Sequence, residues 1–155
     1  MKFSGAIKIK GSVRLLWKRN GVVLSDETFD NTTCTVGIRE VAGLINASRT
    51  GAFAYLALGS SGTEATNADT ALGTEITAAG LARIGATCTR TITDTANDTA
   101  QLLHTFTATN TQAVKEVGIF DTPTSGGIIL GHHTFAAKNM EADDTLAVTY
   151  KIKVA

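Results

Sequence analysis

The sequence predicts a mainly β protein: an antiparallel β-sandwich or jelly-roll-like barrel of about eight strands, with one short α-helix at about residues 35–46. Several segments alternate apolar and polar residues with the period of two that marks a half-buried strand. A single convincing segment repeats apolar residues at helical spacing, and the connections are short and rich in turn residues. Nothing resembles the strand–helix alternation of a parallel α/β fold. We therefore expect one β-sandwich domain over residues 1–155.

The composition supports a compact, electrically neutral domain. Of the 155 residues 43% are hydrophobic and 18% are charged, which is enough apolar material for a core and argues against disorder. Fourteen Lys and Arg balance fourteen Asp and Glu, and this balance argues against binding nucleic acid through bulk charge. No apolar run approaches the roughly 20 residues of a membrane span. Lys and Arg interrupt the N-terminal apolar residues, so we expect neither a signal peptide nor a membrane partner.

The N-terminal segment predicts a basic β-hairpin at about residues 5–30. Residues 7–18 alternate cleanly, Asn20-Gly21 is the pair favoured in a tight hairpin turn, and a second strand follows at 22–29. Residues 1–30, which include this hairpin, contain six of the fourteen basic residues and no acid before Asp26. The basic face of the hairpin is either a solvated edge that guards against aggregation or a docking surface for an acidic partner. The docking hypothesis assigns partner binding to five residues, with Lys2 as a further cation: Lys8, Lys10, Arg14, Lys18 and Arg19.

The sequence predicts different roles for the helix and for one long loop. Ile38, Val41, Ala42 and Ile45 recur at helical spacing, and we expect this stripe to cover an open end or face of a sheet. Residues 59–74 form a long loop of small and polar residues, here called the 59–74 loop. Loops of this length in compact domains usually form functional or interaction surfaces.

The remaining strands are rich in threonine. Ten of the 25 residues from 87 to 111 are Thr, whose branched side chain suits a pleated sheet and whose hydroxyl suits water. The expected strands lie at about residues 52–58, 84–93, 102–109, 114–120, 128–135 and 146–154. Cys34 and Cys88 make no disulfide framework, and we interpret them as small buried thiols.

No catalytic constellation outweighs an ordinary structural interpretation of its residues. The run at residues 59–62 lacks the G-x-S-x-G pattern of a nucleophile elbow. His132 and His133 are adjacent in a strand and should point to opposite faces, so a site would need His104, one of that pair, and a carboxylate such as Asp121. Calcium binding by the acids Glu141, Asp143 and Asp144 lacks EF-hand spacing. We therefore expect no enzyme, no cofactor and no metal.

Three stretches together resemble a known class of protein. They are DNTTCTVGIREVAGLI at 30–45, YLALGSSG at 55–62 leading to TNADTALGTE at 66–75, and KEVGIFD at 115–121 followed by GGIIL at 126–130. Their order resembles small structural proteins of tailed-bacteriophage virions, of the capsid-decorating or tail-fibre-like kind. The resemblance covers about residues 30–155 and brings no catalytic residues with it.

The resemblance implies a non-enzymatic virion protein made in the host cytoplasm. The first hypothesis is a capsid decoration, or cement, protein on the capsid exterior. Its partners would be the phage major capsid protein or other virion proteins, and copies of itself as a dimer or trimer. The second is a tail-fibre, adaptor or receptor-binding module that recognises a host surface through loops such as 59–74 and 121–127. The third is an enzyme, for example a small wall hydrolase with a metal site at the histidines above.

Overall fold

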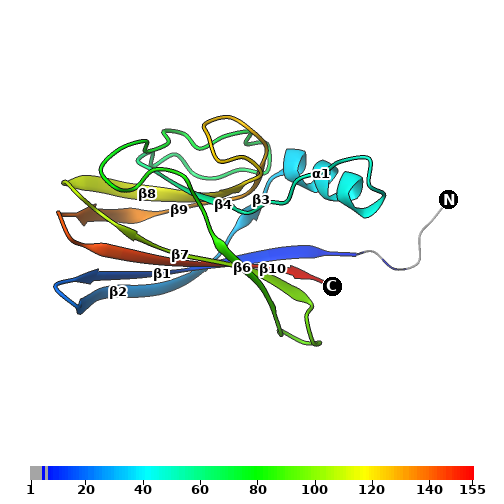
Figure 1. The fold of residues 1–155 in the computed structure, drawn as a ribbon, viewed down its shortest axis with the longest axis horizontal. Helices are drawn as coiled ribbons and strands as arrows, with labels where there is room; N and C mark the ends of the chain where they lie inside the picture. The colour runs from blue at the N-terminus through cyan, green and yellow to red at the C-terminus, as the bar shows by residue number, and fades with distance from the viewer. Residues whose placement is uncertain (1–4, 6) are drawn as a thin grey trace.

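The computed structural model describes residue 5 and residues 7–155, and its ten strands form two antiparallel sheets packed face to face (Figure 1). Sheet A has the order β2 (Val22–Asp30), β1 (Ile9–Arg19), β10 (Thr145–Val154), β7 (Thr99–Thr107), β6 (Thr87–Thr91). Sheet B has the order β3 (Thr32–Thr33), β9 (Ile129–Met140), β8 (Gln112–Phe120), β4 (Tyr55–Gly59), β5 (Ile84–Gly85). The single helix of the described residues is α1 (Thr35–Ile45). The predicted β-sandwich with one short helix is confirmed.

Two strands pass from one sheet to the other, which explains why ten strands are present rather than about eight. The chain of β2 pairs with β1 in sheet A and then, past Asn31, continues as β3 beside β9 in sheet B. The predicted strand at 84–93 is divided in the same way at Ala86, with β5 beside β4 and β6 beside β7. Strands that switch sheets in this manner form the corners of a sandwich. Both edges of the sandwich are therefore linked covalently.

The β1–β2 hairpin has the predicted turn. Asn20 and Gly21 have φ angles of 49° and 76°, the positive values that a type I′ turn requires at both central positions. β1 lies between β2 and β10, with Val13 opposite both Phe29 and Tyr150. The alternation along β1 therefore directs one row of side chains into the sandwich and the other row away from it.

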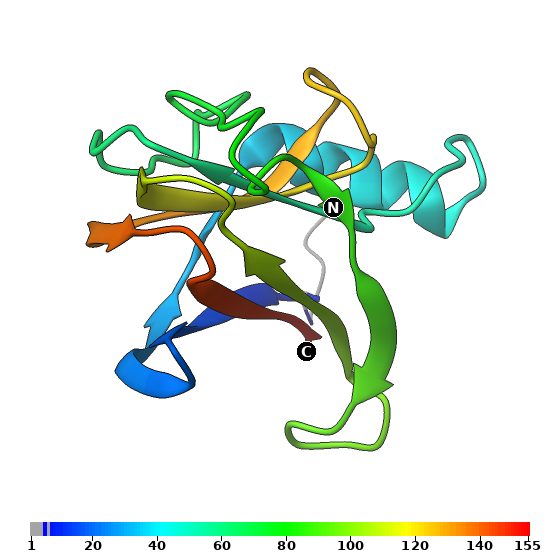
Figure 2. The ribbon, with the colours of Figure 1, turned by 60° about the vertical axis from the view of Figure 1, so that its left-hand side comes forward.

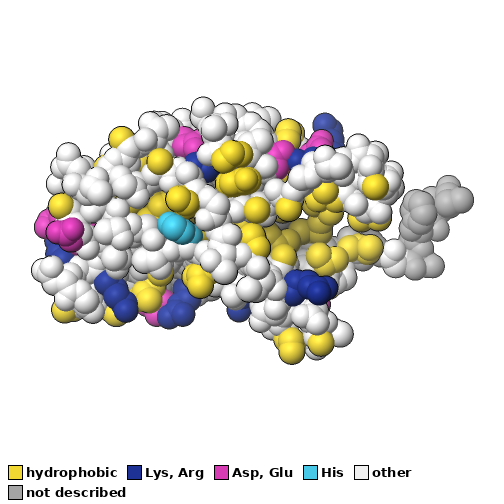
Figure 3. Space-filling model, viewed as in Figure 1, with side chains coloured by type: hydrophobic (Ala, Val, Ile, Leu, Met, Phe, Trp, Pro, Cys, Tyr) yellow, Lys and Arg dark blue, Asp and Glu magenta, His cyan; other side chains and the backbone are white. Residues whose placement is uncertain are grey.

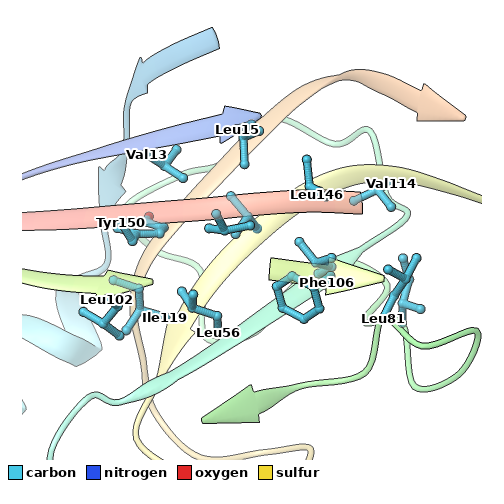
Figure 4. Packing of buried hydrophobic residues seen from close by; sticks show 14 of the residues in the cluster. Val13, Leu15, Leu56, Leu81, Leu102, Phe106, Val114, Ile119, Leu146 and Tyr150 are labelled. Carbon is cyan, nitrogen blue, oxygen red and sulfur yellow. The ribbon is translucent and has the colours of Figure 1, made fainter. Parts of the chain in front are cut away.

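The core lies between the two sheets. Inward side chains of β1, β7 and β10 meet those of β4 and β8 (Figure 4). Ten residues of the core are labelled there, nine on these strands and Leu81 in the connection before β5: Val13, Leu15, Leu56, Leu81, Leu102, Phe106, Val114, Ile119, Leu146 and Tyr150. Apolar burial of this kind is the main favourable contribution to folding, at about 25 cal/mol per Å².

Sheet B is covered on both faces. A second apolar cluster lies on its outer side, where Cys34 and Leu72 pack against Phe120 and Ile129. α1 and the long connections lie over this face, on the side away from sheet A (Figures 1 and 2). This double cover explains why residues 116–120 of β8 are all buried instead of alternating between buried and exposed.

Sheet A presents its outer face to solvent. β10 alternates strictly between buried and partly exposed residues, as expected of a sheet covered on one side. In Figure 1 α1 lies on the side of sheet B that faces away from sheet A, and no helix lies under the outer side of β1 and β2 in sheet A. The sandwich therefore offers one broad, uncovered sheet surface.

The structure corrects two expectations. In the predicted apolar stripe of the helix, Ile38, Ala42 and Ile45 are exposed, and Val41 alone packs partly against the core. The contact of α1 with β9 is made instead at Gly37, where an added Cβ would lie 2.5 Å from Cα of Leu130. Because the helix backbone approaches the sheet at a glycine, its larger apolar side chains flank the contact. The second correction is Cys88, which is exposed on edge strand β6 rather than buried.

Candidate docking surface

The outer face of sheet A collects most of the cations that the sequence assigned to docking. Lys10, Arg14 and Lys18 alternate with the inward-facing residues of β1 and lie on this outer face. Lys8 is exposed just before β1, where its backbone exchanges hydrogen bonds with Ala155. Lys2 lies outside the described residues. Figure 3 shows Lys and Arg side chains along the lower edge of the molecule, where sheet A lies.

Arg19, the fifth assigned residue, has a different environment. Its Nε and Nη2 each lie 2.9 Å from Asp144, whose side chain is 1% exposed and also accepts a hydrogen bond from Trp17 Nε1. A second ion pair joins Arg19 to Glu141. The hydrogen bond from Arg19 is the largest of the effects that lower the pKa of Asp144 to about 2. Arg19 therefore neutralises a buried carboxylate and closes one end of the sandwich.

The structure adds two cations from the last strand to the outer face. β10 pairs with β1, and the register places Lys153 opposite Lys10 and Lys151 opposite Ser12. An open groove of about 390 Å³ runs across four strands at this point. Its lining is made of hydroxyl, amide and cationic side chains: Ser12, Arg14, Thr28, Gln101, Thr149 and Lys151. A surface of this composition suits an anionic, hydrogen-bonding partner.

Some of the cations on this face are neutralised within the chain and others are not. Arg14 makes a bidentate pair with Asp26, with N–O distances of 2.6 and 2.7 Å, and this hydrogen bonding lowers the pKa of Asp26. Lys153 pairs with Asp94. Lys10, Lys18 and Lys151 have no ion-pair partner among the described residues. Lys10 lies opposite Lys153, whose charge Asp94 offsets, so Lys10, Lys18 and Lys151 are the cations on this face that an external anion could pair with.

The 59–74 loop is the second candidate surface, and a buried carboxylate organises it. Glu116 on β8 is fully buried, and its oxygens accept hydrogen bonds from the backbone N–H groups of Ser61, Gly73 and Thr74 at 2.8 to 3.1 Å. These three donors come from both ends of the loop. One side chain therefore joins the ends of the loop to the outer face of sheet B.

His132 extends this network to the middle of the loop. Its Nε2 lies 2.9 Å from Oε2 of Glu116, and its Nδ1 lies 2.7 Å from Oδ2 of Asp69. Burial alone would lower the pKa of His132, but the hydrogen bonds to Glu116 and Asp69 outweigh it and raise that pKa. Burial would likewise raise the pKa of Glu116, but its hydrogen bonds, led by that of His132, lower it. The contacts with the two carboxylates therefore favour the protonated form of His132.

The structure does not assemble the enzyme site considered from the sequence. His104 packs edge-on against Phe106 with ring centroids 4.7 Å apart, whereas Asp121 is bound by Arg49 and by the N–H of Ile128. His132 and His133 point to opposite sides of β9, as expected, and His133 stacks on Phe29 at 4.6 Å. Within residue 5 and residues 7–155, no three His, Cys, Asp or Glu side chains are arranged to hold a metal ion.

In the β9–β10 turn, the acids considered for calcium binding have partners within the protein. Asp144 accepts hydrogen bonds from Arg19, from Trp17 and from the backbone N–H of Glu141. Its oxygens are therefore already occupied by protein donors, and Glu141 pairs with Arg19. The turn acids organise the chain locally, in agreement with the usual role of acids in turns.

The sequence reasoning did not identify two features of the candidate surfaces, the buried Glu116 and the cations of β10. Glu116 carries a signal: it is an acid next to the apolar residues 117–120 of a predicted strand, and a buried acid needs a paired or hydrogen-bonded partner. Lys151 and Lys153 join the basic outer face of sheet A because β10 lies beside β1, and no local sequence pattern specifies which strands are neighbours.

Comparisons with protein-family models, with curated proteins and with solved structures give no match to this chain. The described residues contain no helix with the length and apolarity needed to cross a membrane. The candidate surfaces therefore rest on the geometry above.

Proposed function

We propose that this chain is a non-enzymatic structural protein of a bacteriophage virion that decorates the outside of the capsid shell. It binds coat subunits through the outer face of sheet A and stabilises the contacts between them. The resemblance of residues 30–155 to small virion structural proteins supports the class of protein. The uncovered, basic face of sheet A is the observation that carries the choice of docking surface.

The electrostatics of that face favour an acidic partner. Lys10, Lys18 and Lys151 are free of ion-pair partners among the described residues, and the groove beside them presents hydroxyl and amide groups. Cationic side chains at an interface accelerate association and select partners of opposite charge. Many copies bound to one shell stabilise it by mass action, because each copy binds the assembled lattice and not the free coat subunits.

A binding assay with capsids that lack the chain tests this proposal. Purified wild-type chain should bind expanded capsids to saturation and raise their resistance to heat. The double variant Lys10→Glu and Lys151→Glu should bind about tenfold or more weakly, and wild-type binding should weaken as salt is added. Lys115→Glu, on β8 of the other sheet, is the matched control and should bind as wild type does. Absence of binding by the wild-type chain would rule out the decoration function.

A second candidate function is a tail-fibre, adaptor or receptor-binding module. The observation that favours it is the 59–74 loop, which Glu116, His132 and Asp69 hold in one conformation. A preorganised loop loses little entropy when it binds, which suits specific recognition of a host surface. Binding of labelled chain to host cells, abolished by substitutions at exposed loop positions such as Glu64→Lys, would select this function over decoration.

A further inference from the structure

His132 lies between two carboxylates that are held in different ways. Glu116 is fully buried on β8, and three backbone N–H groups donate to it at 2.8 to 3.1 Å. The side chain of Asp69 is 24% exposed, and besides His132 it accepts hydrogen bonds from the N–H and the hydroxyl of Thr66 in its own turn. Glu116 is therefore fixed in the sheet, whereas Asp69 belongs to the loop and has access to water.

The middle of the 59–74 loop, residues 66–72, is here called the loop crest. The chain on either side of the crest is held separately, because the N–H of Ala65 donates to a side chain of β9 and the N–H of Gly73 donates to a side chain of β8. Within the crest, the contact of Asp69 with His132 is the one side-chain hydrogen bond to a strand among the described residues. The attachment of the crest to sheet B therefore depends strongly on that contact.

The crest covers Cys34, which begins the turn into α1. The thiol is fully buried, and its apolar cluster includes Leu72 of the crest. The next residue, Thr35, donates its N–H to the carbonyl oxygen of Asn67 at 2.9 Å. Burial, and after it the charge of Asp69, raises the pKa of Cys34 to about 12. Opening of the crest would therefore expose this thiol.

The number of protons on His132 decides whether the ring can bind both carboxylates. A ring protonated at both nitrogens donates twice, but a neutral ring has one N–H and one lone pair. If the ring is neutral, the lone pair faces a carboxylate oxygen, and two acceptors at that distance repel each other. The remaining proton stays on Nε2, because leaving the buried Glu116 without this donor costs more than releasing Asp69 to water.

The other titratable groups around His132 do not replace the lost contact. Glu64 is an exposed carboxylate that lines the same small pocket, of about 80 Å³. Cys34 keeps its proton at neutral pH because its pKa is raised, and Thr32, opposite His132 on β3, is uncharged. His133 lies on the other side of β9, where burial, and after it the charge of His132, lowers its pKa. The two histidines therefore titrate in different pH ranges.

We propose that His132 is a pH-sensitive switch that opens and closes the loop crest. With both ring nitrogens protonated, His132 holds Asp69 and the crest covers Cys34. After the loss of one proton, Asp69 leaves the ring and the crest opens, while Glu116 keeps both ends of the loop on sheet B. The pKa of His132 is raised above its ordinary value of 6.5, so the closed state is lost as the pH rises above that value. The switch is independent of the docking face of sheet A.

Labelling of Cys34 tests the proposal. In a parent chain with Cys88→Ser, Cys34 is the one remaining thiol. Its rate of reaction with a small neutral disulfide reagent is measured in the chain unfolded by urea and in the folded chain at the same pH. The ratio of the two rates is a protection factor from which the ordinary ionisation of a thiol cancels. This factor should fall about tenfold or more between pH 6 and pH 9, as expected for one proton released on opening.

Three variants of the parent chain show whether the switch is responsible. His132→Gln does not titrate, so its protection factor should not change with pH. Asp69→Asn removes the charge that distinguishes the two forms of the ring and should lose most of the pH dependence. Glu64→Gln, an exposed acid on the same loop outside the crest, is the matched control and should keep the pH dependence of the parent chain.

Hydrogen exchange shows which part of the loop opens. The amide of Thr35, which donates to the crest, should lose protection as the pH rises, whereas the amide of Gly73, which donates to Glu116, should keep it. Equal loss of protection at both amides would show that the loop detaches as a whole and would overturn the proposal. A protection factor of Cys34 that stays constant from pH 6 to pH 9 in the parent chain, or a fall that persists in His132→Gln, would overturn it as well.

Discussion

Nε2 of His132 lies 2.9 Å from Oε2 of Glu116, inside a sheet face that the 59–74 loop covers. The other ring nitrogen contacts Asp69, so the imidazole ring links a buried strand carboxylate to a loop carboxylate. A buried charge network of this kind is stable only while every member is in the right protonation state. The order of the loop is therefore linked to pH.

The first prediction concerns the pH dependence of stability. The folded-state pKa of His132 is raised above its ordinary value of 6.5. The stability that His132 contributes is therefore fully present below pH 6.5 and is lost as the pH rises through the raised pKa. The folded-state pKa values of Asp69 and Glu116 are lowered from their ordinary values of 3.8 and 4.5. The stability that these two carboxylates contribute is therefore present above the ordinary pKa values and is lost as the pH falls through the lowered pKa values. The network stabilises most between about pH 5 and 6.5.

Denaturant unfolding of wild type and His132→Gln across pH checks this. The difference between their unfolding free energies should be largest near pH 6 and should shrink on both sides of that range. A difference that stays constant from pH 5 to pH 9 would show that His132 is not protonated in the folded protein.

The second prediction concerns Glu116→Gln. An amide cannot replace a carboxylate that accepts from three backbone N–H groups and also contacts the ring of His132, so the variant should lose about 3 kcal/mol of stability. Hydrogen exchange at the amides of Ser61, Gly73 and Thr74 should accelerate more than exchange in the core strands. Glu64→Gln, an exposed acid on the same loop, should leave both measurements unchanged. Equal effects from the two variants would argue against the role assigned to Glu116.

The third prediction separates structural from docking cations in the N-terminal hairpin. Arg19→Ala should lower the midpoint of thermal unfolding, because it leaves the carboxylate of Asp144 buried without its main partner. Lys18→Ala, the neighbouring residue on the outer face, should leave that midpoint unchanged while weakening the binding of an acidic partner. The reverse pattern in thermal unfolding would place Arg19 in the docking set.

The fourth prediction concerns the packing contact between α1 and β9. An added methyl group at Gly37 would lie 2.6 Å from the carbonyl oxygen of Ile129 and must push α1 away from β9. Gly37→Ala should therefore cost about 1–3 kcal/mol of stability in denaturant unfolding, although alanine is the better helix former. Gly62→Ala is the control, because its nearest atom would be 3.7 Å away. A stabilised Gly37→Ala variant would contradict the close packing of α1.

Local sequence patterns predicted the strands correctly where only one face of a strand is buried. The alternation in β1 and β10 and the Asn20-Gly21 turn predicted their strands and hairpin, because a period of two directly reflects a sheet covered on one side. The helix was located correctly, but its buried side was not. Gly37 decides the contact with β9, and the apolar stripe at Ile38 and Ile45 is left exposed.

The sites depend on strand neighbours that no local pattern encodes. The 84–93 segment reads as one strand but changes sheets at Ala86, and Lys151 joins Arg14 in one groove because β10 lies beside β1. Likewise Asp69, 63 residues before His132, reaches that histidine only when the 59–74 loop closes over sheet B. Long-range pairing of this kind follows from the packing of the whole chain.

The proposed capsid location is best tested by a density map of the intact virion at a resolution that places β-strands. We expect copies of the sandwich on the outside of the shell, with the outer face of sheet A, at Lys10 and Lys151, turned toward acidic side chains of the coat protein. Copies found at the tail, or copies on the shell whose sheet A faces solvent, would contradict it.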